Sequence, residues 1–363
     1  MARDMERGDP YLTKHKMPIL ISDANTLRYQ DGQVEVLDRR KFPFEREWLT
    51  CTDYEATARA VEDMVIQGAI GVAVAAGLGY VQAAHTARKF SMDKRRQHLQ
   101  KAAERLRNTR PTGQRLWVLI HELEQIAEKF GGSADLEERL LQHVQGYLAY
   151  FDEVSRETGR HAASLLDDGD TVLTHCYAAG AILWMFHFAR EAGKQISVYS
   201  CETRPYLQGA KLTAPSIHEM GIPVTLITDS MSAYMMAAGK INKYVTAADA
   251  VAMDGSIANK VGTFLHAIAA HAHGIPFFVL AYEGVDPNIN TGADIVIEQR
   301  NADEVKEVNG VPTTIPELRA EYPAFDVTPP EYISAIVCAN GVFAPSDIKN
   351  HVMVEKRPTG ESN

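Results

Sequence analysis

The chain has 363 residues, of which 45% are hydrophobic and 23% charged, and its net charge is -10. This composition is typical of a soluble globular protein with two domains, and the acidic balance argues against a nucleic-acid partner, which binds a basic face. The four cysteines have no paired spacing, which argues against a zinc ribbon and indicates free thiols in a reducing cytoplasm. They are Cys51, Cys176, Cys201 and Cys338.

Neither a signal peptide nor a membrane span is expected. The N-terminus is charged and lacks an apolar segment, and the apolar run of residues 68–81 is shorter than a bilayer requires. The sequence therefore predicts a cytoplasmic protein without a membrane partner.

The N-terminal part, residues 1–160, predicts a mostly helical domain with a small β element. An Asp31-Gly32 turn inside residues 27–37 is typical of a β-hairpin, and Asp53 is suited to cap a helix over residues 54–66. Further helical spacing follows over residues 99–106, 113–130 and 134–158.

Residues 161–356 predict a Rossmann-like, doubly wound parallel sheet, which makes the fold class α/β, and residues 357–363 form a tail expected to be disordered. Strand-like runs at 171–174, 196–200, 224–228, 243–246 and 276–280 alternate with helical segments at 181–192, 207–220, 232–238 and 259–273. A glycine follows each of these helices, as helix C-caps require. The glycine and lysine motifs that hold nucleotide phosphates are missing, so no nucleotide cofactor is expected.

Polar residues follow every predicted strand at its carboxyl end. They are His175-Cys176, Glu202 with Arg204, Asp229-Ser230, Asp249 with Asp254-Gly255, and Tyr282-Glu283. Because parallel strands end at one edge of the sheet, this pattern predicts a substrate crevice there.

Cys176 and Asp249 are the candidates for proton chemistry. The predicted helix after Cys176 would lower the pKa of its thiol through the helix dipole, although an inert buried cysteine is the commoner interpretation of such a residue alone. Apolar neighbours would desolvate Asp249, raise its pKa and keep it protonated as a general acid, although a capping or turn role is the alternative.

Several polar residues are candidates for binding substrate or phosphate. Glu202, Arg204 and Gln208 are crowded just after the second strand, where a structural Glu–Arg ion pair is the alternative. Asn259 and Lys260 are predicted to begin a helix, where a lysine and free N–H groups would hold a phosphate together.

The N-terminal half adds two further candidates. Arg110, beside a proline, is a second phosphate ligand or a solvated arginine. Gln67, Gly68 and Ala69 form either an anion-binding nest or a tight turn between helices.

Taken together, these segments resemble the methylthioribose-1-phosphate isomerase family over almost the whole chain. The superfamily also contains ribose-1,5-bisphosphate isomerases and regulatory subunits of a translation-initiation exchange factor. The resemblance is carried by Leu37-Asp38-Arg39-Arg40, Thr174-His-Cys176, Glu202-Thr-Arg-Pro-Tyr-Leu-Gln-Gly209, Gly221-Ile-Pro-Val-Thr-Leu-Ile-Thr-Asp229, Asn259-Lys-Val-Gly-Thr263 and Pro323-Ala-Phe-Asp-Val-Thr-Pro329.

The resemblance implies an aldose–ketose isomerase that converts 5-methylthioribose 1-phosphate to 5-methylthioribulose 1-phosphate. Cys176 would be the catalytic thiol and Asp249 the acid, and the substrate would be bound by Arg110, Gln208, Asn259 and Lys260. It also implies a homodimer that uses no metal and no nucleotide. Whether the hydrogen passes from C2 to C1 as a proton or as a hydride stays open.

Two departures from the family pattern accompany the resemblance. Gln67-Gly-Ala-Ile-Gly71 stands where the family has Arg-Gly-Ala-Pro-Ala-Ile-Gly, so the arginine is absent and the loop is two residues shorter. The segment after Cys176 is bulkier than the family's glycine- and alanine-rich run. The alternatives are therefore an isomerase of 5-deoxyribose 1-phosphate or ribose 1,5-bisphosphate, or a non-catalytic regulatory subunit.

Overall fold

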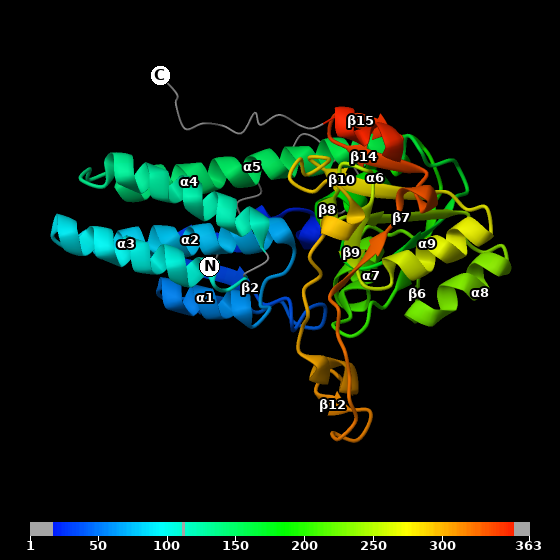
Figure 1. Ribbon diagram of the computed structural model, residues 1–363, viewed down its shortest axis with the longest axis horizontal. Coiled ribbons are helices and arrows are strands. Elements are labelled where there is room, and N and C mark those ends of the chain that lie inside the picture. The colour runs from blue at the N-terminus through cyan, green and yellow to red at the C-terminus, as the bar shows by residue number, and fades with distance from the viewer. Residues whose placement is uncertain (1–16, 111–112, 352–363) are drawn as a thin grey trace.

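The structure is a computed structural model that describes residues 17–110 and 113–351. Figure 1 shows a lobe of long helices beside a lobe built on a twisted sheet, which confirms the α/β class. Helix α5 (Leu136–Ala163) runs from one lobe to the other and continues past the boundary expected at residue 160. The two-domain division at that boundary remains a proposal, and the tail at 357–363 lies outside the described residues.

The helical lobe contains the predicted hairpin. Strands β1 (Leu27–Gln30) and β2 (Gln33–Leu37) pair antiparallel, with β3 (Trp48–Cys51) beside β2. Asp31 and Gly32 both have positive φ, which the two-residue turn requires. The helices are α1 (Tyr54–Glu62), α2 (Ala69–Ala87), α3 (Met92–Arg107), α4 (Gln114–Phe130) and α5. Asp53 caps α1 as expected, but the helix ends at Glu62, four residues before the predicted end.

Helix α2 is longer than the apolar run at 68–81 indicated. It has 19 residues, so by length and composition alone it could cross a membrane, yet 78% of its apolar window is buried. It packs against α1, α3, α4 and α5 as the central helix of the lobe. The apolar run ends before Gln82 although the helix continues. Gln82 is a buried polar residue that donates hydrogen bonds to the carbonyls of Gly32 and Cys51.

The second lobe confirms the doubly wound sheet. Its strand order is β15-β14-β10-β7-β4-β5-β6, and every neighbouring pair is parallel except β14 with β15. The strands are β4 (Thr171–Thr174), β5 (Ser197–Cys201), β6 (Val224–Ile227), β7 (Lys243–Ala247), β10 (Phe277–Tyr282), β14 (Ala335–Cys338) and β15 (Gly341–Phe343). The intervening helices are α6 (Ala179–Glu191), a π-helical turn (Gly209–Thr213) leading into α7 (Ala214–Glu219), α8 (Ser232–Ala237) and α9 (Thr263–Ala272).

The chain direction across this sheet reverses at β4. Counted in sequence, the six parallel strands have the spatial order 3-2-1-4-5-6, and the switch lies between β4 and β7. In open α/β sheets, ligands bind at the carboxyl ends of the two strands that flank this switch.

A small antiparallel sheet corrects the helix predicted over 259–273. Residues 259 and 260 lie in β9 (Ile257–Lys260), between β8 (Ala250–Val251) and β13 (Phe325–Thr328), and α9 begins only at Thr263. The pairing of β9 with β13 joins residues about 65 positions apart, so no local signal could predict it. Asp326 of β13 accepts hydrogen bonds from the N–H groups of Gly262 and Phe264 and so caps α9 from outside the helix.

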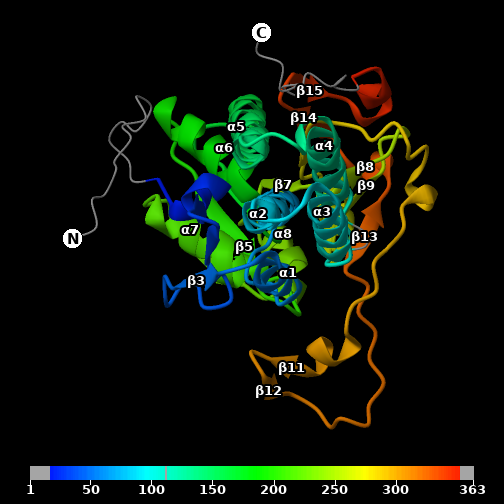
Figure 2. The same ribbon diagram turned by 90° about the vertical axis from the view of Figure 1, so that its left-hand side faces the viewer.

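A two-stranded arm projects from the body of the molecule. It carries β11 (Glu307–Val308) and β12 (Val311–Pro312), and Figures 1 and 2 show it standing clear of both lobes. Apolar side chains are exposed on it, among them Val311, Ile315 and Leu318.

Candidate active site

Cys176 and Asp249 follow the two strands that flank the switch point. Cys176 comes two residues after the end of β4, and Asp249 comes two residues after the end of β7. Since β4 and β7 are hydrogen-bonded neighbours, the sheet brings these two residues to one place at its carboxyl edge.

The backbone at Cys176 is held in a turn by two threonines. Cys176 has a φ of 65, which non-glycine residues adopt rarely. Its N–H donates to Oγ1 of Thr203 over 2.8 Å, and its carbonyl accepts from Oγ1 of Thr213 over 2.6 Å. The segment Glu202–Gly209 and the π-helical turn after it therefore position the thiol.

Asp229 organises the Glu202–Gly209 segment. Its carboxylate accepts hydrogen bonds from the backbone N–H groups of Thr203 (2.8 Å) and Arg204 (2.7 Å). Gly209 lies so close to the end of strand β5 that a Cβ at this position would be 1.8 Å from the carbonyl oxygen of Cys201. These contacts explain why the segment carries a glycine at position 209 and why an aspartate lies two residues after the neighbouring strand β6.

The side chains of Glu202 and Arg204 have separate environments. The Arg204 guanidinium donates to the carbonyls of Val305 (3.0 Å) and Glu307 (2.8 Å) and so ties the projecting arm to the sheet. Glu202 is partly buried, and burial together with the charge of Asp229 raises its pKa. Contact of either side chain with a substrate stays a prediction.

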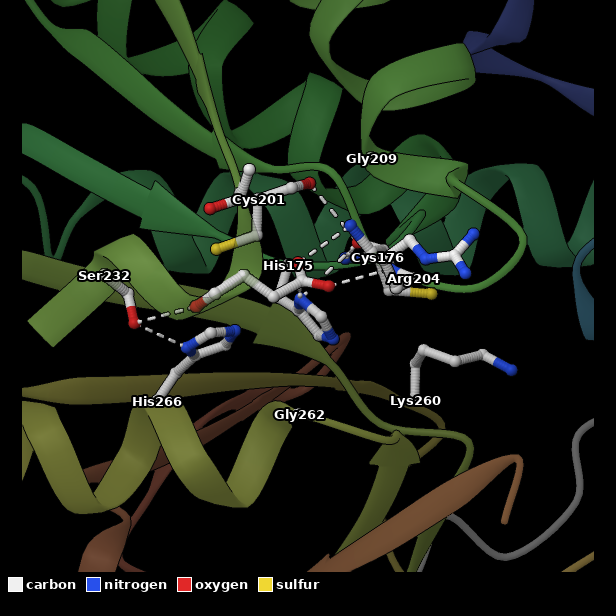
Figure 3. A network of polar contacts seen from close by, with 12 residues as sticks. His175, Cys176, Cys201, Arg204, Gly209, Ser232, Lys260, Gly262 and His266 are labelled. Carbon is white, nitrogen blue, oxygen red and sulfur yellow. Dashed lines mark hydrogen bonds and ion pairs between the residues drawn. The ribbon is translucent and has the colours of Figure 1, made fainter. Parts of the chain in front are cut away.

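Lys260 reaches the site from β9. Only 4% of the residue is exposed, and its ammonium lies 4.8 Å from the ring centre of Phe325 and 5.7 Å from that of Tyr322. Burial lowers the pKa of Lys260, and the charges of Cys176 and Asp249 oppose this. Figure 3 shows the side chains of Cys176 and Lys260 pointing to the same side. The prediction that Lys260 begins a helix is wrong, because Lys260 is the last residue of strand β9.

The pKa of Cys176 moves against expectation. Burial raises the pKa of the thiol to about 12, and the charge of Lys260 and a hydrogen bond from the Tyr177 backbone oppose this. Desolvation by tertiary contacts is the largest influence on this pKa, and a sequence without tertiary contacts could not reveal it.

The pKa of Asp249 moves as expected. Burial raises it and the charges of Lys260 and Arg115 oppose the rise. The Asp249 residue is nevertheless exposed to solvent, so a substrate that excludes water is needed for desolvation to take full effect.

Two predicted amides differ in how far their hydrogen bonds are satisfied. Nδ2 of Asn259 donates to Thr246 (3.2 Å) and Thr263 (2.9 Å), which fixes the side chain behind the strand end. Gln208 is 6% exposed, and its Oε1 has no hydrogen-bond partner among the described residues. A buried unpaired acceptor is costly and suits a site completed by a ligand.

The helical lobe contributes a second group of cations. Arg110 is partly buried, and burial and the charge of Arg300 lower its pKa. Two guanidinium groups that act on each other in this way favour an anion between or beside them. Arg300 comes from the long segment after β10, and the sequence offered no signal for it.

The Gln67 loop is supported from behind by Arg39. Arg39 is fully buried and donates to the carbonyl of Gln67 over 2.6 Å, while Nε2 of Gln67 donates to the Tyr206 hydroxyl over 2.8 Å. Gly68 has a φ of 88 and precedes α2, and Ala69 is exposed as the first residue of that helix. The predicted turn between helices is thus present, and anion binding there stays a prediction.

Two of the strand-end carboxylates have structural partners. Asp254 accepts hydrogen bonds from the N–H groups of Ser256 and Gly292, which is the turn role considered for it. Glu283 forms an ion pair with Arg115.

The fold and the site place this chain in a known class of proteins. The chain belongs to the Initiation factor 2 subunit family, whose model matches residues 65–345. Among curated relatives, the methylthioribose-1-phosphate isomerase of Thermosipho africanus is 39% identical over 328 residues, covering 88% of this chain and 95% of the relative.

Two solved structures have the same fold, and their TM-scores against this chain are nearly equal. The 5-methylthioribose 1-phosphate isomerase of Pyrococcus horikoshii has a TM-score of 0.81 at 29% identity, covering 90% of this chain and 94% of that one. The translation initiation factor eIF-2B subunit delta from A. fulgidus has a TM-score of 0.79 at 32% identity, covering 92% and 97%. The fold is therefore shared by proteins whose names give different functions.

Proposed function

We propose that this protein is an aldose–ketose isomerase that converts 5-methylthioribose 1-phosphate to 5-methylthioribulose 1-phosphate. The observation that carries the proposal is the placement of Cys176 and Asp249 on adjacent strands at the switch point, with the buried Lys260 acting electrostatically on both. The curated relatives, which match 88% of this chain and 95% of their own length, support the substrate class.

The first step of the proposed reaction opens the sugar ring. The phosphate at C1 locks the ring, so the bond between C1 and the ring oxygen must break before isomerisation. Asp249, protonated in the bound state, donates its proton to the ring oxygen as this bond breaks. A substrate that displaces water from Asp249 raises its pKa further through desolvation and through the negative charge of its phosphate.

The second step moves hydrogen from C2 to C1, and two routes are open. In the proton route, the Cys176 thiolate takes the C2 proton, an enol forms between C1 and C2, and the proton returns to C1. In the hydride route, hydrogen moves with its electron pair from C2 to the electron-poor C1. In both routes the C2 hydroxyl gives up its proton, which restores the proton that Asp249 donated to the ring oxygen. The raised pKa of Cys176 favours the hydride route, since only a small fraction of this thiol is ionised near neutral pH.

Turnover in deuterium oxide separates the two routes. The proton route exchanges with solvent and places deuterium on C1 of the product, whereas the hydride route leaves C1 without solvent deuterium. Carbon and proton NMR of the ketose product measures this directly.

The substrate phosphate is proposed to lie between Lys260 and Arg110, while Oε1 of Gln208, unpaired in the described part of the chain, accepts a hydrogen bond from a sugar hydroxyl. Asn259 would hold the strand end from which Lys260 extends. The N-terminal end of α2 at Gly68, with the Gln67 side chain beside it, is the other candidate contact.

An activity assay on a panel of 1-phosphorylated pentoses tests the proposal. We expect turnover of 5-methylthioribose 1-phosphate and loss of several orders of magnitude on Asp249→Asn. Cys176→Ser should lose as much if the proton route operates, because a serine hydroxyl stays protonated near neutral pH. Cys338→Ser, a buried thiol in β14, is the matched control and should retain turnover.

The same assay decides between the alternatives. Preference for 5-deoxyribose 1-phosphate or ribose 1,5-bisphosphate would keep the chemistry and change the substrate. No turnover of any pentose 1-phosphate by a folded protein would contradict the proposal and favour the regulatory subunit.

We also propose a cytoplasmic homodimer. The exposed apolar side chains of the arm, such as Val311 and Ile315, are suited to contact a second copy, and all four cysteines are free thiols. Light scattering after size-exclusion chromatography measures the mass in solution, and a monomer at micromolar concentration would contradict the dimer.

A further inference from the structure

A cluster of metal-ligating side chains lies behind the Cys176 turn. His175, Cys201, Asp229 and His266 each offer one ligand atom, and these four atoms lie within 4.8 Å of one another. Figure 3 shows Cys201, Ser232 and His266 on the opposite side of the turn from the side chains of Cys176 and Lys260. Three of the four are fully buried, and the Asp229 side chain is 22% exposed.

Each histidine is oriented by a short hydrogen bond through one ring nitrogen, and the other nitrogen of His175 has a long contact of 3.4 Å with the Thr203 hydroxyl, which a metal ion would replace. Nε2 of His175 lies 3.0 Å from the carbonyl oxygen of Val261, which requires the proton on Nε2 and leaves a lone pair on Nδ1. That Nδ1 is 3.8 Å from Oδ1 of Asp229. A ring nitrogen that donates to a backbone carbonyl while the other binds a metal is the usual arrangement of metal-ligating histidines.

His266 supplies an independent indication of a ligand. Its Nδ1 is 2.8 Å from Oγ of Ser232, while its Nε2 is buried and has no hydrogen-bond partner among the described residues. The ring lies against that of His175, with 4.7 Å between centroids. A buried nitrogen without a partner costs free energy that a metal ion would recover.

The charges and donor types match a divalent ion. Asp229 and an ionised Cys201 supply two negative charges, and the two imidazoles bind as neutral ligands. The Asp229 carboxylate is already fixed by two backbone N–H groups, from Thr203 and Arg204, and each oxygen retains a lone pair. Two nitrogens, one sulfur and one oxygen suit tetrahedral zinc or cobalt and are poor ligands for magnesium or calcium.

We propose that His175, Cys201, Asp229 and His266 form a structural site for one divalent transition-metal ion of the zinc class. Binding releases the Cys201 proton to solvent and draws the four ligand atoms from within 4.8 Å to roughly 3.4–3.6 Å of one another, as Zn–N, Zn–O and Zn–S bond lengths require. The ion joins three strand ends and α9, and so fixes the residue before Cys176 without reaching the substrate side. The sequence had indicated no metal, because these four residues are dispersed over about 90 positions.

The experiment titrates cobalt(II) into full-length protein that has been dialysed against a chelator. We expect about one equivalent to bind, with the intense visible bands of tetrahedral cobalt and a near-ultraviolet band from a cobalt–thiolate bond. His266→Leu should abolish both sets of bands, and Cys201→Ser should remove the thiolate band. Ser232→Ala, which removes the partner of His266, should weaken binding about 10–100-fold.

Matched variants exclude other sources of the signal. Cys338→Ser, also a buried thiol, and His271→Leu, an exposed histidine of α9, should bind cobalt as the wild type does. Absence of tetrahedral bands in the wild type, or bands that survive His266→Leu and Cys201→Ser, would overturn the site. If His266→Leu does not fold, the comparison of Cys201→Ser with Cys338→Ser gives the answer on its own.

Discussion

Replacing Lys260 with methionine should reduce substrate binding without reducing the stability of the fold. The Lys260 residue is only 4% exposed, and its ammonium faces two aromatic rings and is influenced by the groups of Cys176 and Asp249. Methionine is similar in length, is apolar, and packs well against aromatic rings such as Phe325.

The expected magnitudes follow from what the ammonium contacts. Loss of its interaction with the rings of Phe325 and Tyr322 costs about 0.5–2 kcal/mol, whereas relief from burying an unpaired charge recovers several kcal/mol. The free energy of unfolding should therefore stay unchanged or rise by about 1–3 kcal/mol. Loss of a charge-assisted contact with phosphate should weaken substrate binding by about 1.5–3 kcal/mol, which is roughly 10–150-fold in affinity.

Two measurements on one variant test this reasoning. Calorimetric titration with the substrate or with inorganic phosphate gives the affinity, and urea unfolding gives the stability. Lys211→Met is the matched control, because Lys211 also lies over a tyrosine ring, 5.1 Å from the centre of Tyr206, and its pKa is also lowered by burial. Unchanged affinity in Lys260→Met, or a stability loss above about 1 kcal/mol, would refute the assignment of Lys260 as a functional buried charge.

Three further outcomes are expected. The rate of alkylation of Cys176 by iodoacetamide should increase about tenfold per pH unit from pH ~7 to ~10, because the pKa of the thiol is raised to about 12 and only the thiolate reacts. Mass spectrometry measures this rate, and a plateau near pH ~8 would contradict the prediction. Gly159→Ala should lower the free energy of unfolding by about 1–3 kcal/mol, since the new Cβ would lie 2.4 Å from Cβ of Trp184, whereas Gly132→Ala has room and serves as control in urea unfolding. Arg300→Gln should raise the KM for the phosphorylated substrate about tenfold or more with little change in kcat, and an unchanged KM in steady-state assays would remove it from the phosphate site.

The sheet was predictable because its signals are local. Each strand is a short apolar run, each following helix ends at a glycine with positive φ, such as Gly193 or Gly221, and the polar residues sit directly after the strands. Parallel strands then leave little freedom, so the meeting of the ends of β4 and β7 followed from topology.

What could not be predicted depends on contacts between distant segments. Lys260 resembled the start of a helix because its pairing with Phe325 is invisible in a local window. The thiol of Cys176 resembled an activated nucleophile because the helix after it is local, whereas the burial that raises its pKa is tertiary. Arg300 lies in a segment without regular periodicity, so its position beside Arg110 could be seen only in three dimensions.

The two departures from the family pattern, separate in the sequence, meet at one position in the structure. The shortened loop begins at Gly68, whose surroundings include the ring of Tyr177 at 3.8 Å from the position a Cβ would take. Tyr177 is the first of the bulky residues after Cys176, its hydroxyl donates to the carbonyl of Leu20, and the Arg39 guanidinium lies 5.7 Å from its ring centre.

Since Arg39 also holds the carbonyl of Gln67, the loop, the arginine and the tyrosine form one supported unit beside the thiol. The loss of an arginine at position 67 does not leave the site without positive charge, because Arg110, Arg300 and Lys260 supply it from other elements. The chemistry at C1 and C2 can therefore be retained while the wall formed by Tyr177 and Gly68 differs from the family. We infer that any difference in substrate choice from the relatives arises at this wall and not at Cys176 or Asp249.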